Sequence, residues 1–465
     1  MRVTVIGTGY VGTVTGACLA YLGHHVTCVD TDASKIGKLR LGLAPIYEPG
    51  LEELIALARS SGGIDFETDM TAPVRESDVI FIAVGTPPLP SGESDLTWLE
   101  AAARGIGAAM DASRFRVVVN KSTVPVGSGN LVGTLVREGL DDHTVTFGVA
   151  SNPEFLREGS AIHDSLYPDR IVVGAEDERT VQVMRRLYQP LVDQQFADPS
   201  FSPRPLSMQP VPMVTTTLTS AEMIKYSANA FLATKIGFAN EIANICERVG
   251  ADVTEVMKGI GLDSRIGRSF LNAGIGWGGS CFGKDISSLL HTASEYGYQA
   301  RLLEASVAVN RLQRQIVIQK LQEKLFILKG RTVALLGLAF KPNTDDLRDA
   351  PSLQIAEKLL QMGARVRAYD PIAMSVCRLQ HPDLRISYCA DAQSAAEHAD
   401  ALVLVTEWPE FASLDLADMA SRMSQAVLID GRNLFDPARA RTAGFEYAGI
   451  GRATGKPARA DDANH

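Results

Sequence analysis

Residues 2–12 read RVTVIGTGYVG, a β-branched run that leads directly into three spaced glycines. Such a run is typical of a buried strand, and the residues that follow it predict a helix. Gly7 permits a tight turn, Gly9 lets a ligand approach the backbone, and Gly12 allows the helix to pack closely on the strand. The N-terminus of that helix would face a bound phosphate. The stretch therefore predicts the strand, turn and helix of a dinucleotide site.

An acidic residue follows where a dinucleotide site needs one. Asp30 ends the next predicted strand, HVTCVD (25–30). Its carboxylate can accept hydrogen bonds from an adenosine ribose and would repel a 2′-phosphate, so NAD is expected rather than NADP. A GxGxxG pattern alone could be only a glycine-rich turn, but the flanking strand, helix and acid favour the dinucleotide site.

Short apolar runs alternate with helical stretches in two parts of the chain. The first part continues with VIFIAV (79–84), RVVVNKS (116–122) and TFGVAS (146–151). The second part contains TVALLGL (332–338), RVRAYDP (365–371), ALVLVTE (401–407) and AVLIDGR (426–432). This rhythm is typical of βαβ units. The predicted fold is α/β, with two Rossmann-like doubly wound parallel-sheet domains joined by a long central helix.

The region between these two parts predicts that helix. Thr219-x-x-Glu222 is a capping-box pattern, and the chain continues to about Val249 without a proline. Its apolar positions are too numerous for one buried stripe, which fits a helix between two domains or a dimer interface. We therefore expect a homodimer or a higher homo-oligomer. Before the helix, residues 194–215 are rich in proline and predict a mobile surface loop without a catalytic role.

Length and composition set outer limits. A chain of 465 residues exceeds the usual size of one hydrophobic core, so we expect domains over 1–215, 216–320 and 321–455, with a disordered tail over 456–465. The net charge of −9 gives no basic surface for nucleic acid. No run is long and apolar enough for a membrane span, and the N-terminus does not read as a signal peptide. The six cysteines lack the paired spacing of disulfides or zinc sites, so no metal and a cytoplasmic location are expected.

The most informative stretch is GWGGSCFGKD, residues 276–285. Glycines let the backbone approach a ligand, and a helix that starts after Cys281 would favour the thiolate. Lys284 adds positive charge nearby. A lone cysteine is usually a small buried hydrophobe, which is the interpretation we give to Cys18, Cys28 and Cys246. Cys281, between glycines and beside Lys284 and Asp285, is instead predicted to be a nucleophile.

Two threonines follow predicted strands at the edge where open α/β sheets bind ligands. Thr86 lies in Gly-Thr-Pro-Pro after the run 79–84, and Thr123 lies in Lys-Ser-Thr-Val-Pro after the run 116–122. Position alone leaves two alternatives open, a ligand contact or a turn residue that caps a helix.

Several motifs together resemble the UDP-glucose 6-dehydrogenases, within the UDP-glucose/GDP-mannose dehydrogenase superfamily. They are GTGYVG, VGTPP, KSTVPVG, NPEFLREG (152–159), PDRIVVG (168–174), SAEMIKYSANAFLATKIGFANE (220–241), DSRIG (263–267), FLNAGIGWGGSCFGKD (270–285) and LAFKPNTDDLRDAPS (338–352). The resemblance covers residues 1 to 452. It implies an NAD-binding first domain, a central dimerisation region and a UDP-sugar-binding C-terminal domain.

The resemblance also implies a reaction and its residues. A sugar primary alcohol is oxidised twice by NAD, and Cys281 carries the intermediate as a thiohemiacetal and then as a thioester that water hydrolyses. Lys225 and Asn229 match residues that stabilise the oxyanion and handle the alcohol proton, and their i, i+4 spacing would place them on one helix face. Asp285, Thr123 and Glu154 match residues that position or activate water, and the choice among them stays open.

Binding residues are implied in the same way. The positions that match NAD contacts, besides Gly7, Gly9 and Gly12, are Val11, Asp30, Lys35, Thr86, Thr123, Glu158, Lys284 and Arg348. Those that match UDP-sugar contacts, besides Lys225 and Asn229, are Glu154, Phe155, Leu156, Arg157, Glu158, Arg265, Phe270, Leu271, Asn272, Ala273, Gly274, Gly278 and Lys341. Arg265 resembles an arginine that relatives contribute across a dimer.

The sugar is the least determined part of this interpretation. The GGSCF form of the cysteine loop resembles the UDP-glucose branch, and GDP-mannose or a UDP-N-acetylhexosamine is the alternative. Two functions of other kinds compete with it: a non-catalytic NAD-binding protein, and a two-electron hydroxyacid dehydrogenase that needs no nucleophilic cysteine.

Overall fold

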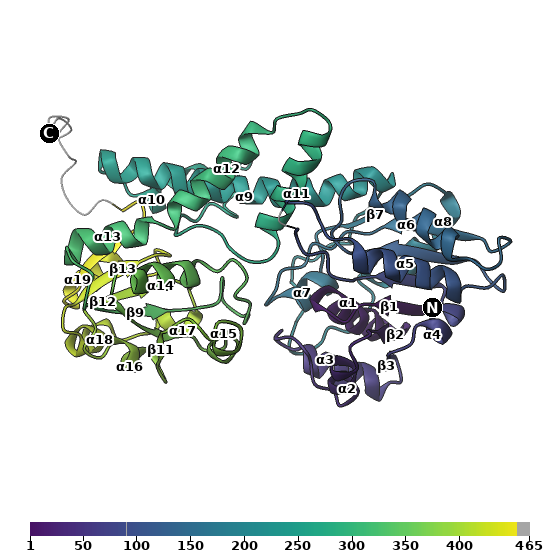
Figure 1. The fold of residues 1–465 in the computed structure, drawn as a ribbon, viewed down its shortest axis with the longest axis horizontal. Helices are drawn as coiled ribbons and strands as arrows, with labels where there is room; N and C mark the ends of the chain where they lie inside the picture. Colours follow the sequence, from purple (N-terminus) through teal and green to yellow (C-terminus); the bar gives the residue numbers. More distant parts are fainter. Residues whose placement is uncertain (90, 453–465) are drawn as a thin grey trace. The chain divides into compact units, whose positions relative to one another are not determined.

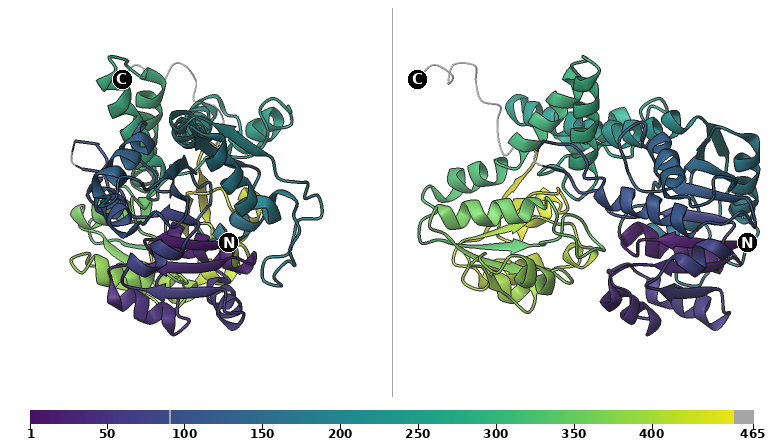
Figure 2. Two further views of the ribbon diagram at one scale, coloured as in Figure 1. Left: turned by 90° about the vertical axis from the view of Figure 1, so that its right-hand side faces the viewer. Right: turned by 45° about the vertical axis from the view of Figure 1, so that its right-hand side comes forward.

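The computed structural model describes residues 1–89 and 91–452. The expected disordered tail, 456–465, lies outside the described residues. The chain divides into two compact units, one of Met1–Ala228 with Ser287–Gly297 and the other of Asn229–Ile286 with the chain from Tyr298 onward. Each unit holds one β-sheet with helices on both of its faces, as the ribbon views show (Figures 1 and 2).

The first unit contains an eight-stranded sheet in the order β3-β2-β1-β4-β5-β6-β7-β8. The strands are β1 (Arg2–Ile6), β2 (His25–Val29), β3 (Ile64–Glu67), β4 (Val79–Ile82), β5 (Arg116–Asn120), β6 (Phe147–Ser151), β7 (Ile171–Ala175) and β8 (Met213–Thr216). All neighbours pair in parallel except β6 and β7, which pair antiparallel. The order from β3 to β6 is that of a doubly wound dinucleotide-binding sheet, so this part of the predicted fold is confirmed.

Alternation along the strands feeds two cores in this unit. Val79 and Phe81 pack with α1 (Tyr10–Tyr21), α3 (Leu51–Ser60), α7 (Ala161–Leu166) and α8 (Glu178–Val192). Their neighbours Ile80 and Ile82 pack on the other face with α4 (Thr71–Glu76), α5 (Thr97–Ala109) and α6 (Ser128–Gly139). Successive side chains of a strand point to opposite faces, so a continuous apolar run is what a sheet covered on both sides requires.

The second unit contains a six-stranded sheet in the order β11-β10-β9-β12-β13-β14, with every pairing parallel. Its strands are β9 (Thr332–Leu336), β10 (Arg365–Tyr369), β11 (Ser387–Tyr388), β12 (Ala401–Leu404), β13 (Val427–Asp430) and β14 (Glu446–Gly449). The helices of this region are α13 (Ile316–Leu325), α14 (Pro351–Gln361), α15 (Met374–Gln380), α16 (Ala392–Ala396), α17 (Pro409–Ala412), α18 (Leu416–Arg422) and α19 (Pro437–Thr442). The second predicted Rossmann-like domain is therefore confirmed.

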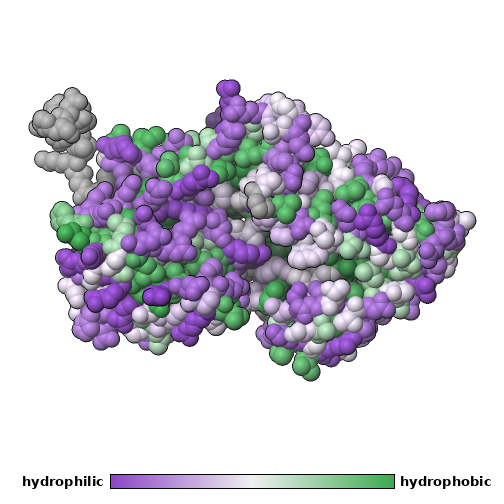
Figure 3. Space-filling view, viewed as in Figure 1, coloured by the Kyte–Doolittle hydropathy of each residue, from purple (hydrophilic) through white to green (hydrophobic). Residues whose placement is uncertain are grey.

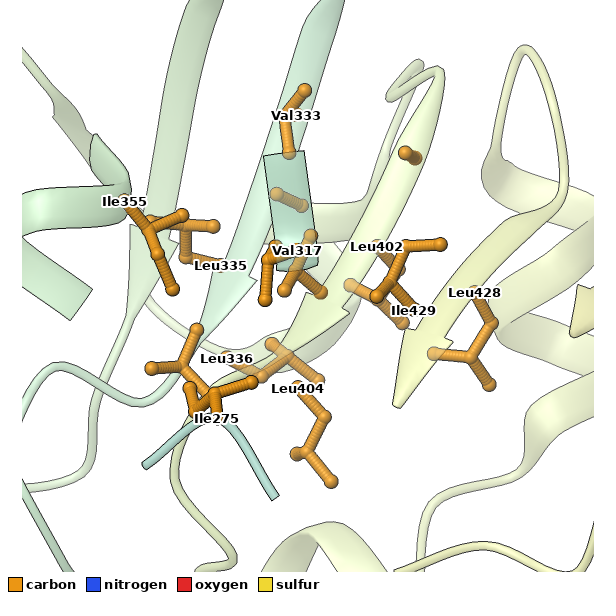
Figure 4. Packing of buried hydrophobic residues seen from close by; sticks show 14 of the residues in the cluster. Ile275, Val317, Val333, Leu335, Leu336, Ile355, Leu402, Leu404, Leu428 and Ile429 are labelled. Carbon is orange, nitrogen blue, oxygen red and sulfur yellow. The ribbon is translucent and has the colours of Figure 1, made fainter. Parts of the chain in front are cut away.

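The core of this sheet also holds part of the cysteine-containing segment. Ile275 is fully buried and lies beside Leu336 and Leu404 at the ends of β9 and β12 (Figure 4). Ile275 thus anchors the chain a few residues before Cys281 to a rigid sheet.

On the molecular surface, hydrophilic side chains cover much of the visible face, with hydrophobic ones between them (Figure 3).

Helix α9 (Leu218–Val249) runs for 32 residues, as the sequence predicts. The predicted capping box is wrong, however, because the helix begins before Thr219. Thr217 caps it, with its Oγ1 accepting a hydrogen bond from the Ser220 N–H at 3.2 Å. Glu222 does not reach back to a capping residue and instead binds the loop before α6. The remaining helices are α2 (Ala33–Arg40), α10 (Val253–Gly261), α11 (Phe282–Glu295) and α12 (Arg301–Gln313).

The proline-rich segment 194–215 is a correction to the sequence interpretation, because its end is a strand. β8 (Met213–Thr216) pairs in parallel with β7. Earlier in the segment the Tyr167 hydroxyl donates to the Ser202 carbonyl at 3.0 Å, and Phe201 packs so close to Gly50 that a Cβ there would lie 2.5 Å from its ring. These contacts tie the segment to the first unit, and the prediction of its mobility stays a prediction.

Candidate active site

The glycine turn after β1 has the geometry that its sequence predicts. Gly7 has a φ of 99°, and a Cβ there would lie 2.6 Å from the Ala83 carbonyl oxygen. A Cβ on Gly12 would lie 1.8 Å from the Gly7 carbonyl oxygen. Gly9 is exposed, and a Cβ there would meet nothing within 4 Å. The turn therefore leaves open space in front of the N-terminus of α1, and this space fits a pyrophosphate.

Asp30 is held in place by the same turn. Its carboxylate accepts hydrogen bonds from the N–H and the hydroxyl of Thr8, both at 2.8 Å, and Lys35 Nζ lies 3.7 Å away. Burial works to raise the pKa of Asp30, but the hydrogen bonds from Asp32 and Thr8 and the charge of Lys35 together lower it. A fixed, ionised carboxylate at the end of β2 is suited to a ribose diol.

The other predicted NAD residues divide between the two units. The first unit contains Val11, Lys35, Thr86, Thr123 and Glu158, and the second contains Lys284 and Arg348. Thr86 is buried, and its hydroxyl donates to the Thr123 carbonyl at 2.6 Å, so the two threonines are joined directly. Arg348 is exposed and pairs with Asp346 at 2.7 Å.

Lys225 and Glu154 form a buried ion pair in the first unit. Lys225 Nζ donates to Glu154 Oε1 at 2.7 Å, and the two side chains are only 6% and 7% exposed. The second carboxylate oxygen of Glu154 accepts the Leu156 N–H at 2.9 Å. The Phe155 ring lies 3.7 Å from the Arg170 guanidinium carbon and 5.6 Å from Lys225 Nζ. Arg157 is exposed and pairs with Asp164 at 2.6 Å. A buried lysine of this kind is not a solvated helix lysine.

In the second unit Cys281 directly precedes α11 and is the exposed member of the six cysteines, the other five being buried. The Asp285 N–H donates to the Cys281 carbonyl at 2.9 Å, which closes the first turn of the helix. Asp285 is buried, and its carboxylate accepts a hydrogen bond of 2.6 Å from Asn229 Nδ2. Lys284 Nζ lies 3.9 Å from the same carboxylate. The predicted helix start after the thiol is confirmed.

The chain before Cys281 is fixed by buried amides and by backbone packing. The Asn240 side chain accepts the Gly274 N–H at 2.8 Å, and Asn310 accepts the Trp277 N–H at 2.8 Å. A Cβ on Gly278 would lie 2.4 Å from the Asp349 carbonyl oxygen, and one on Gly279 would lie 2.7 Å from the Phe340 ring. These glycines therefore serve close packing of the loop against residues 338–351.

The remaining predicted sugar-nucleotide residues lie in the same unit. Leu271, Ala273, Gly274 and Gly278 are buried, Phe270 and Lys341 are half-buried, and Asn272 is exposed. Phe270 has a φ of 63°, an uncommon backbone conformation for a residue with a side chain. Arg265 is 87% exposed and pairs with Asp263 at 2.5 Å, so its guanidinium extends from the surface.

Three family descriptions match successive parts of the chain. Residues 1–192 match the NAD binding domain of the UDP-glucose/GDP-mannose dehydrogenase family, residues 219–312 its central domain, and residues 334–437 its UDP binding domain. The chain belongs to the UDP-glucose/GDP-mannose dehydrogenase family. The resemblance inferred from the motifs is thus confirmed, and the dinucleotide site of the first unit is the NAD site of this family.

Individual relatives match this member of the family along almost its whole length. UDP-glucose 6-dehydrogenase TuaD of Bacillus subtilis is 47% identical over 97% of this chain and 93% of its own. UDP-glucose 6-dehydrogenase of Rhizobium meliloti is also 47% identical, over 97% of this chain and 100% of its own. The solved structure of a UDP-glucose dehydrogenase from Pyrobaculum islandicum is 39% identical, with a TM-score of 0.86, and covers 97% and 98% of the two chains.

Among the residues that the structure describes, no group of three or more histidines, cysteines and acids could hold a metal ion. No helix in residues 1–89 and 91–452 has the length and apolar character that crossing a membrane requires.

Sequence reasoning missed several residues that support the site. Lys121 stands two residues before Thr123, and its side chain donates to Asn152 Oδ1 at 3.0 Å. Glu48 is buried, and it accepts the N–H groups of Gly159 and Ala161 at 2.6 and 2.7 Å. A buried acid looks like any surface acid in a sequence. Only the position of Lys121 inside the KSTVPVG motif could have indicated its importance.

Proposed function

We propose that this chain oxidises the primary alcohol of UDP-glucose to the carboxylate of UDP-glucuronate, in two NAD-dependent steps through a covalent intermediate on Cys281. The exposed thiol at the start of α11, followed by the buried Asp285 that binds Asn229, is the observation that supports this proposal most directly. A non-catalytic NAD-binding protein would have no use for that arrangement. The three relatives described above bear the name of this activity, which supports UDP-glucose over other sugar nucleotides.

In this proposal the glycine turn, the N-terminus of α1 and Asp30 hold NAD, which accepts a hydride from the sugar carbon when bound. The protein supplies the remaining chemistry. Lys225 and Asn229 stabilise negative charge on the sugar oxygen, one through an ammonium and the other through an amide N–H. Cys281 adds to the aldehyde to give a thiohemiacetal, and the second oxidation leaves a thioester.

Hydrolysis then releases the product from sulfur. Water attacks the thioester carbon, the carbon–sulfur bond breaks, and the thiolate returns while a base takes the proton of water. Glu154, Asp285 and Thr123 are the candidates for activating that water. Glu154 and Asp285 are both buried carboxylates with hydrogen-bond partners that fix their orientation, so either is suited to the role.

The stoichiometry of NADH formation tests this function. With limiting UDP-glucose and excess NAD, we expect two NADH for each UDP-glucose, measured by absorbance, and UDP-glucuronate as the product by mass spectrometry. One NADH for each sugar would indicate a two-electron dehydrogenase, and none would indicate a non-catalytic protein. A higher kcat/KM for GDP-mannose or a UDP-N-acetylhexosamine would replace the proposed sugar.

Assembly and location complete the proposal. Apolar side chains on α9 are exposed at Phe231, Phe238, Ile245 and Val249, and a second copy of the chain would cover them in a homodimer. All six cysteines are free thiols, which fits a reducing compartment, and we propose the cytoplasm. We further propose that residues 1–215 act as the NAD-binding domain, 216–320 as the dimerisation region and 321–455 as the UDP-sugar-binding domain.

A further inference from the structure

A cavity of about 80 Å³ lies in the first unit, with walls that are more apolar than polar but carry several charged side chains. Lys121, the residue after β5, lines this cavity, and so does Glu154. The other groups with charge or a titratable proton on its wall are Cys18 on α1, Asp164 on α7, Arg170 before β7 and Tyr188 on α8. Lys225 of α9 completes the set through its ion pair with Glu154.

Lys121 fixes the turn that carries Glu154. Its Nζ donates to Asn152 Oδ1 at 3.0 Å, and the Tyr188 hydroxyl donates to the same oxygen at 2.5 Å. The Asn152 side chain in turn donates to the Val172 carbonyl at 2.8 Å. Asn152 is 2% exposed and stands two residues before Glu154, so its orientation is transmitted to the carboxylate through Pro153. Loss of the Lys121 ammonium would remove one of the two donors that hold Asn152.

Lys121 also changes the charge around the ion pair. Glu154 and Lys225 neutralise each other, and Lys121 adds a second ammonium that interacts with both. Burial lowers the pKa of Lys121 to about 8. The negative charge of Glu154 opposes this shift, and the positive charge of Lys225 adds to it. The group is therefore charged at neutral pH, although less firmly than an ordinary lysine. A cluster of two ammonium groups and one carboxylate favours developing negative charge nearby.

We propose that Lys121 is a positioning residue for this oxidation: it orients Glu154 through Asn152 and provides a second positive charge to the Glu154 carboxylate. The proposal rests on the proposed function, because it assigns Glu154 to the activation of water. Charge on Lys121 favours the carboxylate form that can accept a proton, and so supports turnover at the acidic end of the pH range.

Lys121→Gln tests the charge. Glutamine can still donate to Asn152 but carries no charge. We expect kcat to fall roughly tenfold, with the KM for UDP-glucose changed by no more than about twofold, since the effect is on chemistry. The acid limb of the kcat profile should move to higher pH, because the substitution removes a positive charge that interacts with Glu154. Lys121→Arg retains the charge and should keep the acid limb where the wild type has it.

A control comes from a lysine that is paired with an acid away from this cavity. Lys320 on α13 is 9% exposed and pairs with Glu247 at 2.7 Å in the other unit. Lys320→Gln makes the same chemical change at a distance from Glu154, so we expect a loss of thermal stability with a wild-type pH profile. A general effect of a destabilised fold would appear in both variants.

The outcomes separate this inference from the proposed function. If the wild type forms no NADH from UDP-glucose, the proposed function fails before the variants are compared. If the wild type is active and Lys121→Gln has its acid limb unmoved, the role of Lys121 is overturned. An acid limb that moves as far in Lys121→Arg as in Lys121→Gln overturns it too. Should Lys121→Gln not fold, the arginine variant decides alone: a wild-type limb supports the role, and a shifted limb excludes it.

Discussion

At the residue scale, Cys281 gives the sharpest prediction. In Cys281→Ser the hydroxyl is far less acidic than the thiol, so capture of the aldehyde should weaken, and any acyl adduct would be a slowly hydrolysed ester. We expect a folded protein that binds NAD and either accumulates a sugar adduct, visible by mass spectrometry of the intact chain, or turns over at a trace rate. Cys389→Ser, at a buried cysteine away from the site, is the control. Near-normal UDP-glucuronate formation by Cys281→Ser would exclude covalent catalysis by this residue.

The buried pair of Lys225 and Glu154 predicts a separation of stability from activity. Lys225→Met leaves the Glu154 carboxylate buried without its nearest countercharge and should cost about 3 kcal/mol of unfolding free energy, at the lower end of the usual range because Lys121 remains. Activity should fall on the order of a hundredfold, as for one oxyanion donor. Adding Glu154→Gln should restore much of the stability in urea unfolding and none of the activity. A double variant no more stable than Lys225→Met would contradict this account of the pair.

These residues also show how far a sequence predicts a site. Gly7, Gly12 and Asp30 follow from local rules, because a turn and a strand end involve only near neighbours. Cys281 is predictable from its glycines and its charged neighbours. Lys121 and Glu48 are not, since their partners lie 31 and 111 residues away along the chain and only the folded sheet brings them together.

At the element scale, a single carboxylate joins α9 to the N-terminus of α6. Glu222 accepts the N–H groups of Gly127 and Gly129 at 2.6 and 2.7 Å and the Ser151 hydroxyl at 3.1 Å. A Cβ on Gly129 would lie 3.1 Å from the Glu222 carboxylate, so glycine gives that acid its place. The loop before α6 also carries Thr123. The sequence pattern predicts that Glu222 caps its own helix, because the same carboxylate could bind a nearby N–H group. In the structure it binds N–H groups that are distant in sequence instead.

Stability should depend on pH through Glu222. Burial raises the pKa of Glu222, although the hydrogen bonds from Gly127, Gly129 and Ser151 lower it in part. A carboxyl whose pKa is raised on folding stabilises the fold most below its unfolded value of about 4.3, and this contribution is lost as pH rises through the folded value. The unfolding free energy of the wild type should therefore fall with rising pH relative to that of Glu222→Gln, which lacks this titration.

Urea unfolding of both proteins over a series of pH values measures that difference, since every other titrating group is common to the two. A difference that is constant, or that grows in favour of the wild type as pH rises, would show that the carboxylate is stabilised rather than strained by its burial. The same preparations report the KM for NAD, which we expect to rise in Glu222→Gln because Thr123 lies in the loop that Glu222 holds.

At the scale of the whole molecule, the sequence predicts the two sheets and the central helix but not every element at their margins. Four of the missed strands, β3, β8, β11 and β14, have only two to four residues each, so their hydrophobic pattern is weak. For this reason the sequence assigns β8 to the proline-rich loop. Replacement of 194–215 as a unit would remove this edge strand, so only the part before β8 is a candidate for a neutral replacement.

The exposed face of α9 carries the prediction about assembly. Phe231, Phe238, Ile245 and Val249 are 66%, 48%, 49% and 62% exposed. Seven-residue and four-residue steps bring them to one side of the helix, and a stripe of this kind on a folded chain is normally covered by a partner.

Replacing Phe231 and Phe238 together by Glu places two carboxylates on each copy of that stripe, where symmetry would bring like charges together. In sedimentation at micromolar protein we expect the wild type to be a dimer and this variant a monomer. Leu379→Glu, which changes an 82% exposed leucine on α15, should remain dimeric and controls for added charge alone. A wild type that sediments as a monomer would mean that the stripe is solvent-facing and that no second copy is needed to cover it.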